Sequence, residues 1–135
     1  MKVANSFFAD TIIRDAERNT LTIVDLIEEF DVPSFPAVMP RLSLCFIIVR
    51  EDGDEATANL ELKFISPHGS QSFEIQANFE DKMRTRVITR FEGYVIFQPG
   101  VIRAELHKGT NLLGVCETKA VGTTTPNVPN IVQSS

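Results

Sequence analysis

The sequence contains no tryptophan and only one tyrosine, although it contains ten phenylalanines. Trp and Tyr combine a flat apolar ring with a polar tip, which suits them to stacking on sugars and other amphipathic ligands. Their scarcity weakens the case for a carbohydrate-binding or small-ligand protein, which remains the alternative to the function favoured below. The phenylalanines instead predict a core built largely from Phe.

Basic residues are outnumbered, with 13 Lys and Arg against 18 Asp and Glu and a formal net charge of -5. Proteins that bind nucleic acid need clustered Lys and Arg to neutralise phosphates. Docking to an anionic membrane needs the same excess of positive charge. We therefore expect no nucleic-acid partner and no membrane partner.

Cysteine and the signals of targeting are equally sparse. Cys45 and Cys116 lie in apolar runs and form no CxxC or other metal-binding spacing. Such cysteines are commonly buried free thiols, although a disulfide across two packed sheets, as in antibody domains, is an alternative. The first residues form no long apolar segment, and no run is long enough to span a bilayer. Together these features predict a protein of the reducing cytoplasm.

Histidine and grouped metal ligands are too few for familiar catalytic chemistry. His68 lies in a Pro-His-Gly turn and His107 near the end of a strand-like run, and neither has a nucleophile at a recognised spacing. We expect no enzyme and no cofactor. Asp52 and Asp54, in the acidic turn between Glu51 and Glu55, are weak candidates for a calcium site, because hard cations prefer several oxygen ligands. The favoured interpretation of this turn is a solvated hairpin tip.

Short runs with a two-residue hydrophobic period dominate the chain. In the stretch from Phe91 to Leu113, the residues Ile102, Ala104 and Leu106 alternate with polar neighbours between two turns, at Pro99-Gly100 and Lys108-Gly109. About eight such strands, with turn signals every eight to twelve residues, predict an all-β fold. We expect a two-sheet antiparallel β-sandwich, immunoglobulin-like or C2-like, with a closed barrel as the alternative. Residues 1–118 would form this domain and residues 119–135 a polar C-terminal tail.

Three segments are less regular. Residues 23–30 have helical spacing as well as β-branched residues, so a short helix competes with a strand there. Asp31 to Arg41 contains three prolines, which predicts an irregular crossing segment. If the tail is ordered, Val128, Ile131 and Val132 are expected to pack in a groove of the same or another chain.

Two features predict surface contacts. One face of a predicted strand carries Arg84, Arg86 and Arg90, and Arg103 would lie on a neighbouring strand. This basic stripe could bind an acidic partner. Alternatively, it is an outer face whose charge is balanced by nearby carboxylates, or a charged strand edge that prevents aggregation. The second feature is apolarity on both faces. Phe7 and Phe8 must point to opposite sides of one strand, and Leu42 to Arg50 is apolar almost throughout. We assign Phe8 to an interaction surface. The stronger alternative is that another segment of the same chain covers the second apolar face.

Three short segments also resemble a known family. They are Ala4-Asn5-Ser6-Phe7-Phe8-Ala9-Asp10, Phe35-Pro36-Ala37 and Gln98-Pro99-Gly100. They are similar to segments of a family of small bacterial proteins of unknown function that are predicted to be stand-alone β-sandwiches. The resemblance covers roughly residues 3 to 118, and it departs from the family at Val101, where an aromatic residue is frequent. It implies a fold and carries no catalytic or binding residues.

By elimination, these observations favour a non-catalytic β-sandwich module for protein–protein interaction or self-assembly. Its partner would be another protein or a second copy of the chain. The contact would be made by apolar side chains on the outer faces of strands and by strand edges that no neighbouring strand covers.

Overall fold

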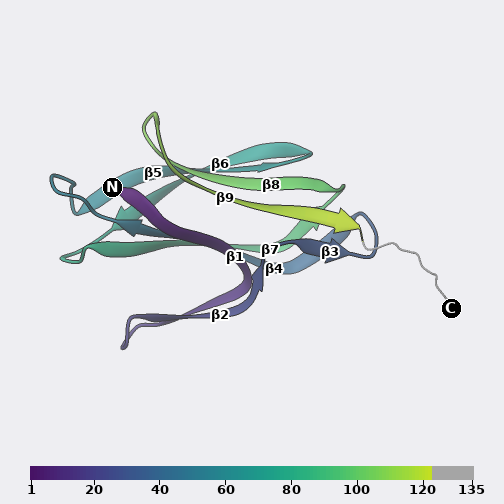
Figure 1. The fold of residues 1–135 in the computed structure, drawn as a ribbon, viewed down its shortest axis with the longest axis horizontal. Coiled ribbons are helices and arrows are strands. Elements are labelled where there is room, and N and C mark those ends of the chain that lie inside the picture. Colours follow the sequence, from purple (N-terminus) through teal and green to yellow (C-terminus); the bar gives the residue numbers. More distant parts are fainter. Residues whose placement is uncertain (123–135) are drawn as a thin grey trace.

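Nine strands in two packed sheets form the protein, in a computed structural model that describes residues 1–122 (Figure 1). The strands are β1 (Lys2–Asp15), β2 (Thr20–Ile27), β3 (Phe30–Val32), β4 (Ala37–Val49), β5 (Thr57–Ser66), β6 (Gly69–Asn78), β7 (Arg84–Ile96), β8 (Gly100–Lys108) and β9 (Asn111–Gly122). The predicted all-β sandwich is confirmed, with one strand more than expected.

The first sheet has the order β2-β1-β4-β7 and the second the order β3-β9-β8-β5-β6. All pairings are antiparallel except that of β3 with β9, which is parallel. Within residues 1–122 no segment is helical, so the helix considered for residues 23–30 is wrong, and no helix of the membrane-spanning kind occurs there. The β-branched residues of this segment explain the outcome, since their stiff side chains suit a pleated strand.

The core lies between the facing sides of the two sheets. Its largest fully buried side chains include Phe8, Phe46, Phe79, Leu62 and Leu106. The alternating residues Ile102, Ala104 and Leu106 of β8 are all buried, and β8 and β9 form the predicted hairpin at Lys108-Gly109. Inside the core, Phe64 meets the rings of Phe8, Phe91 and Tyr94. The expectation of a phenylalanine-built core is confirmed.

Element boundaries differ from expectation in two places. The segment from Asp31 to Arg41 is more regular than its prolines predict, because β3 and the start of β4 lie within it. Pro40 lies in a part of β4 that pairs with β7 on one side only, because the pairing of β4 with β1 is confined to Ser43 onward, so its missing N–H can face the unpaired side. Strand β9 continues past Thr118, its predicted end, to Gly122. The tail residues Val128, Ile131 and Val132 lie outside the described residues.

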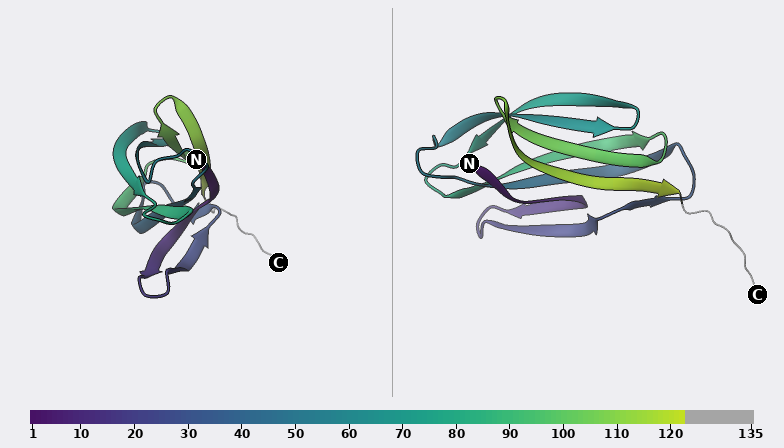
Figure 2. Two further views of the ribbon diagram at one scale, coloured as in Figure 1. Left: turned by 90° about the vertical axis from the view of Figure 1, so that its left-hand side faces the viewer. Right: turned by 45° about the horizontal axis from the view of Figure 1, so that its top comes forward.

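The two parts of strand β1 pair with different neighbours and lie in different layers of the molecule. Its first part pairs with β4 as far as Ala9, and its second part pairs only with β2. We call residues 10–27, the second part of β1 together with β2, the arm. In Figure 1 the arm turns back beneath β4 and β7, and Figure 2 shows it as a separate layer below the sandwich. The molecule is therefore a sandwich with one hairpin folded against its outside.

Candidate functional site

The arm covers an apolar patch on the outer face of the first sheet. Ala9, Ile12 and Cys45 are buried in a cluster separate from the main core, with the partly buried side chains of Phe7, Leu21, Ile47 and Ile88 packed around them. Ile12 and Leu21 come from the arm, and the others come from β1, β4 and β7. The two-sided apolarity of the sequence thus has an intramolecular cause, since the second face of β4 is covered by the chain's own hairpin.

Two arginines of β7 tie the arm to the sheet. Arg86 donates from Nη1 to Oδ1 of Asn19 and from Nη2 to the carbonyl oxygen of Asn19, both at 2.8 Å. Arg90 donates from Nη2 to the carbonyl oxygen of Ile12 at 3.1 Å. Asn19 is at the arm's tip, with a positive φ of 54°, a conformation that Asn tolerates better than most residues. These arginines therefore position the arm as well as carrying charge.

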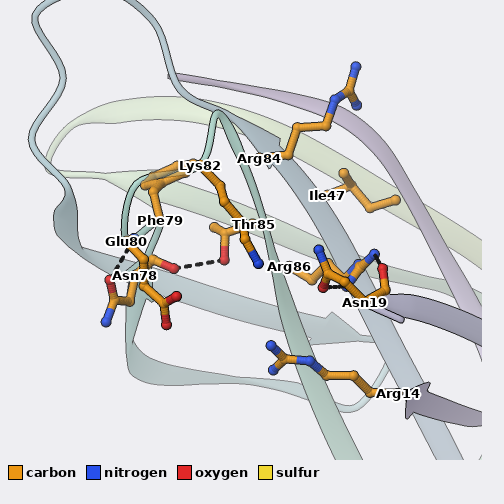
Figure 3. Close-up of a pocket in the computed structure, with 10 residues that line it drawn as sticks. All are labelled: Arg14, Asn19, Ile47, Asn78, Phe79, Glu80, Lys82, Arg84, Thr85 and Arg86. Atoms are coloured by element: carbon orange, nitrogen blue, oxygen red, sulfur yellow. Dashed lines mark hydrogen bonds between the residues drawn. The ribbon is translucent and has the colours of Figure 1, made fainter. Parts of the chain in front are cut away.

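A cleft of about 270 Å³ opens between the arm's tip and the start of β7 (Figure 3). Four cationic residues line it, and we call it the basic cleft: Arg14, Lys82, Arg84 and Arg86. The other lining residues are Asn19, Ile47, Asn78, Phe79, Glu80 and Thr85. Figure 3 shows the end of Lys82 to one side of the Arg86–Asn19 pair and Arg14 below the pair, while the guanidinium of Arg84 points away.

The charge of this cleft is not balanced by the surrounding protein. Among residues 1–122, Arg14, Lys82, Arg84 and Arg86 form no ion pair. Residues 123–135 contain no Asp or Glu side chain that could supply one. Glu80 is the one acidic residue in the lining, against four cationic residues. On a chain with net charge -5, such a cluster concentrates positive potential where it attracts anions.

Of the four arginines predicted to form a stripe, three lie together. Arg84, Arg86 and Arg90 do share the outward face of β7, and the first two line the cleft. The placement of Arg103 beside them is wrong. The turn at Gln98-Pro99 carries the chain from β7 in the first sheet to β8 in the second, so Arg103 lies in the other layer.

Arg103 belongs instead to a self-neutralised network on the second sheet. Its Nε lies 2.6 Å from Glu105, and its Nη1 lies 2.8 Å from Glu117. The ring of His107 is also 2.8 Å from Glu105. The hydrogen bond from His107, followed by that from Arg103, lowers the pKa of Glu105. This outer face is balanced by its own carboxylates and leaves little charge for a partner.

The assignment of Phe8 to an interaction surface is wrong. Its side chain is 1% exposed and makes an edge-on contact with Phe64, with ring centroids 6.2 Å apart. The outward member of the pair is Phe7, which packs beneath the arm. A register irregularity between Val3 and Asn5 shifts the alternation of β1, and sequence alone does not reveal such a bulge.

The acidic turn after β4 is tied to the N-terminus. The ammonium group of Met1 contacts Glu51 and lies 2.6 Å from Oδ2 of Asp54, which also accepts a hydrogen bond from the amide of Glu51. The ammonium lowers the pKa of Asp54. Asp52 does not line the basic cleft, and no three His, Cys, Asp or Glu side chains within residues 1–122 are grouped as metal ligands.

Both cysteines are buried free thiols, as expected. Cys45 lies in the cluster beneath the arm and Cys116 in the main core. Burial raises the pKa of Cys45 to about 11, and burial likewise raises the pKa of Cys116. Thiols of this kind are poor nucleophiles at neutral pH.

Arg14, Asn19 and Lys82 were not singled out by the sequence pattern. Lys82 comes from the turn that leads directly into β7, whereas Arg14 and Asn19 come from the arm and reach Arg86 only because the arm folds back. The sequence did contain one indication of the arm's position. Both faces of β4 are apolar, so another segment had to cover the outer face. That cover could have been traced to the N-terminal hairpin because Ile12 and Leu21 are apolar there.

Comparison with known proteins identifies a family and leaves the activity open. No curated protein matches the chain in sequence. The model of a family of unknown function, DUF6941, matches residues 5–117, which include all nine strands in whole or in part. The chain therefore belongs to the DUF6941 family.

Proposed function

We propose that this protein is a non-catalytic binding module that holds an acidic segment of a partner protein in the basic cleft. One observation carries the proposal. Four cationic side chains without an ion pair line a cleft on a protein whose net charge is negative. A fold gains nothing from leaving such charges close together, because like charges repel, whereas an acidic partner would turn the repulsion into attraction.

The position of the cleft supports a protein segment as the occupant. The cleft lies at one end of the molecule, between the arm's tip and the turn preceding β7. Met83, within that turn, is 58% exposed and offers an apolar contact beside the charges. Partner chains commonly combine such charged and apolar contacts, and flexible Met side chains adapt to different neighbours.

The alternative of a carbohydrate ligand has less support. The residues that line the cleft include no Tyr or Trp, and the ring of Phe79 is buried in the core rather than presented as a stacking platform. The charge of the lining favours an anion over a neutral sugar.

Charge reversal inside and outside the cleft tests the proposal. A fluorescent poly-glutamate peptide serves as the acidic segment, and its binding is measured by anisotropy at low ionic strength. The double variant Arg14→Glu/Lys82→Glu is expected to weaken binding at least roughly tenfold, since charge complementarity sets such encounters. The matched control is Lys63→Glu/Lys119→Glu, which makes the same change in net charge on the second sheet. Equal weakening by both double variants, or by neither, would contradict the proposal.

Self-association is a second candidate, and the free edge of the arm supports it. Strand β2 lies at the end of its sheet, with one charged residue, Asp25, in its eight. Beside this edge Ile13, Val24 and Leu26 are between 38% and 54% exposed. Proteins usually protect an edge strand with Lys or Pro, and β2 has neither. A second copy pairing along β2 would cover this row.

The remaining expectations belong with this proposal. We expect a cytoplasmic protein without a cofactor, and the two free thiols support a reducing compartment. An immunoglobulin-like or C2-like relationship likewise remains a prediction.

A further inference from the structure

The guanidinium of Arg86 is held ready to receive an anion. Two of its five N–H donors are used by Asn19, one on the side-chain oxygen and one on the main-chain oxygen. These bonds restrict the orientation of the group before any ligand arrives, so less conformational entropy is lost on binding. Three donors remain, in the plane that matches two oxygens of a phosphate or carboxylate.

More positive charge converges here than a single carboxylate neutralises. In Figure 3 the end of Lys82 lies to one side of the Arg86–Asn19 pair and Arg14 lies below the pair; like Arg86, both form no ion pair within residues 1–122. An Asp or Glu side chain carries one negative charge. A phosphorylated side chain carries roughly -1.5 to -2 near pH 7 and presents three strong acceptor oxygens. Three converging cations match the phosphate better than the carboxylate.

The neutral residue Asn78 forms one wall of the cleft and is held there by two hydrogen bonds. The Oδ1 atom of Asn78 accepts a hydrogen bond from the amide of Glu80 at 2.9 Å, and its carbonyl oxygen accepts one from the hydroxyl of Thr85 at 3.0 Å. These two contacts fix Asn78 at the cleft and occupy its oxygens. In Figure 3 its side-chain nitrogen points away from the Arg86–Asn19 pair, so Asn78 forms a wall of the cleft and does not join the cations.

We infer that the basic cleft recognises a phosphate monoester on a side chain of the partner, such as phosphoserine. The inference rests on the proposed function, since it names the chemistry by which the acidic segment is held. Arg86 supplies the oriented fork, and Arg14 and Lys82 supply the remaining charge. Met83, exposed next to Lys82 in sequence, contacts the residues that flank the phosphorylated one.

Three peptide libraries test the inference. They share the same degenerate flanking residues and carry serine, glutamate or phosphoserine at a fixed central position. Immobilised on beads, they are compared for retention of the whole protein. The phosphoserine library is expected to retain at least about ten times more protein than the glutamate library, in keeping with the stronger bonds of phosphate to Arg. The serine library is expected to retain only background amounts.

Two variants connect the preference with named residues. Arg86→Lys keeps the charge but removes the fork, so it should abolish the preference for phosphoserine over glutamate. Arg14→Gln should weaken phosphoserine binding several-fold without touching the bonds that hold the arm. Thermal melts of both variants show whether they remain folded. If Arg86→Lys melts early, Arg14→Gln alone decides, and unchanged phosphoserine binding by it would overturn the inference.

The outcomes separate this inference from the proposed function. Equal retention on glutamate and phosphoserine would overturn phosphate selectivity and leave binding of an acidic segment standing. Retention on neither would overturn both. Inorganic phosphate and free phosphoserine, tested as competitors, identify the source of the phosphate. If either displaces the protein at the concentration at which a phosphopeptide does, the ligand is a small phosphate compound and the protein-borne site is refuted.

Discussion

At the scale of single residues, the reactivity of Cys45 measures how well the arm buries the apolar cluster beneath it. Its pKa is raised to about 11 by burial, so the thiolate at pH 8 amounts to roughly one part in a thousand, against about a quarter for an unperturbed thiol. We expect a disulfide reagent such as Ellman's reagent to label the native protein at least about 100-fold more slowly than the denatured one. The rate should rise with pH up to about 11. Instant labelling of one thiol in the native state would contradict the burial of that residue.

Gly114 allows β9 to pass close to β1. A Cβ atom at this position would lie 2.6 Å from Cγ2 of Val3, which is too short for a real contact. We expect Gly114→Ala to lower the free energy of unfolding by about 1–3 kcal/mol, the usual cost of overpacking. Gly122→Ala in the same strand is the matched control, because its Cβ would meet Phe35 at an ordinary 3.5 Å. Equal urea midpoints for the two variants would show that Val3 moves aside without cost.

At the scale of elements, the arm is joined to the sandwich by few side chains. Ile12 is 2% exposed beneath it, while the adjacent Ile13 is 52% exposed. Ile12→Ala is expected to reduce the free energy with which the arm packs on the sheet by about 2–5 kcal/mol. Labelling of Cys45 should then become faster, while labelling of Cys116 should stay slow. Ile13→Ala makes the same change of side chain on the opposite face, where we expect less than about 0.5 kcal/mol. Faster labelling of Cys116 as well would mean that the arm and the main core unfold together.

The elements also show what the sequence could predict. Strands with strict alternation, such as that of Ile102, Ala104 and Leu106, were located correctly because the two-residue period states which side is buried. The arm was not foreseen, since the alternation of β1 does not reveal that its pairing with β4 stops at Ala9. Arg103 was misplaced for a related reason. Sequence order does not determine which strands are neighbours, and the chain changes sheets between β7 and β8.

The candidate site could be predicted only in part. Arg84 and Arg86 were visible as a stripe because they occupy one strand. Arg14 was not, because it reaches the same cleft from a segment far away in the chain, and Lys82 was not, because it lies in the turn before the strand and outside the alternating pattern. A sequence pattern reports charge along an element, whereas a cleft depends on how separate elements are brought together by packing.

At the scale of the whole molecule, the protein has two surfaces of opposite character. The partner proposed for the basic cleft would be held by attraction between unlike charges, which added salt weakens. The self-association proposed at the edge of β2 would use main-chain hydrogen bonds and the exposed side chains of Ile13, Val24 and Leu26, between two copies that each carry a net charge of -5. Salt screens that repulsion, because the Debye length falls from about 10 Å at 0.1 M to about 3 Å at 1 M. Salt should therefore affect the two proposed interactions in opposite directions.

Light scattering over a concentration series, at low and at high salt, checks this prediction for the edge of β2. The mean mass of the wild-type protein is expected to rise with concentration and to rise further at high salt. Val24→Lys places a charge on the exposed row and should keep the protein monomeric under both conditions. Val101→Lys is the matched control, since Val101 is similarly exposed but lies on β8 in the other sheet. If the mass stays monomeric throughout, self-association is no longer a candidate. Binding at the basic cleft, which salt should suppress, is then judged by its own variants.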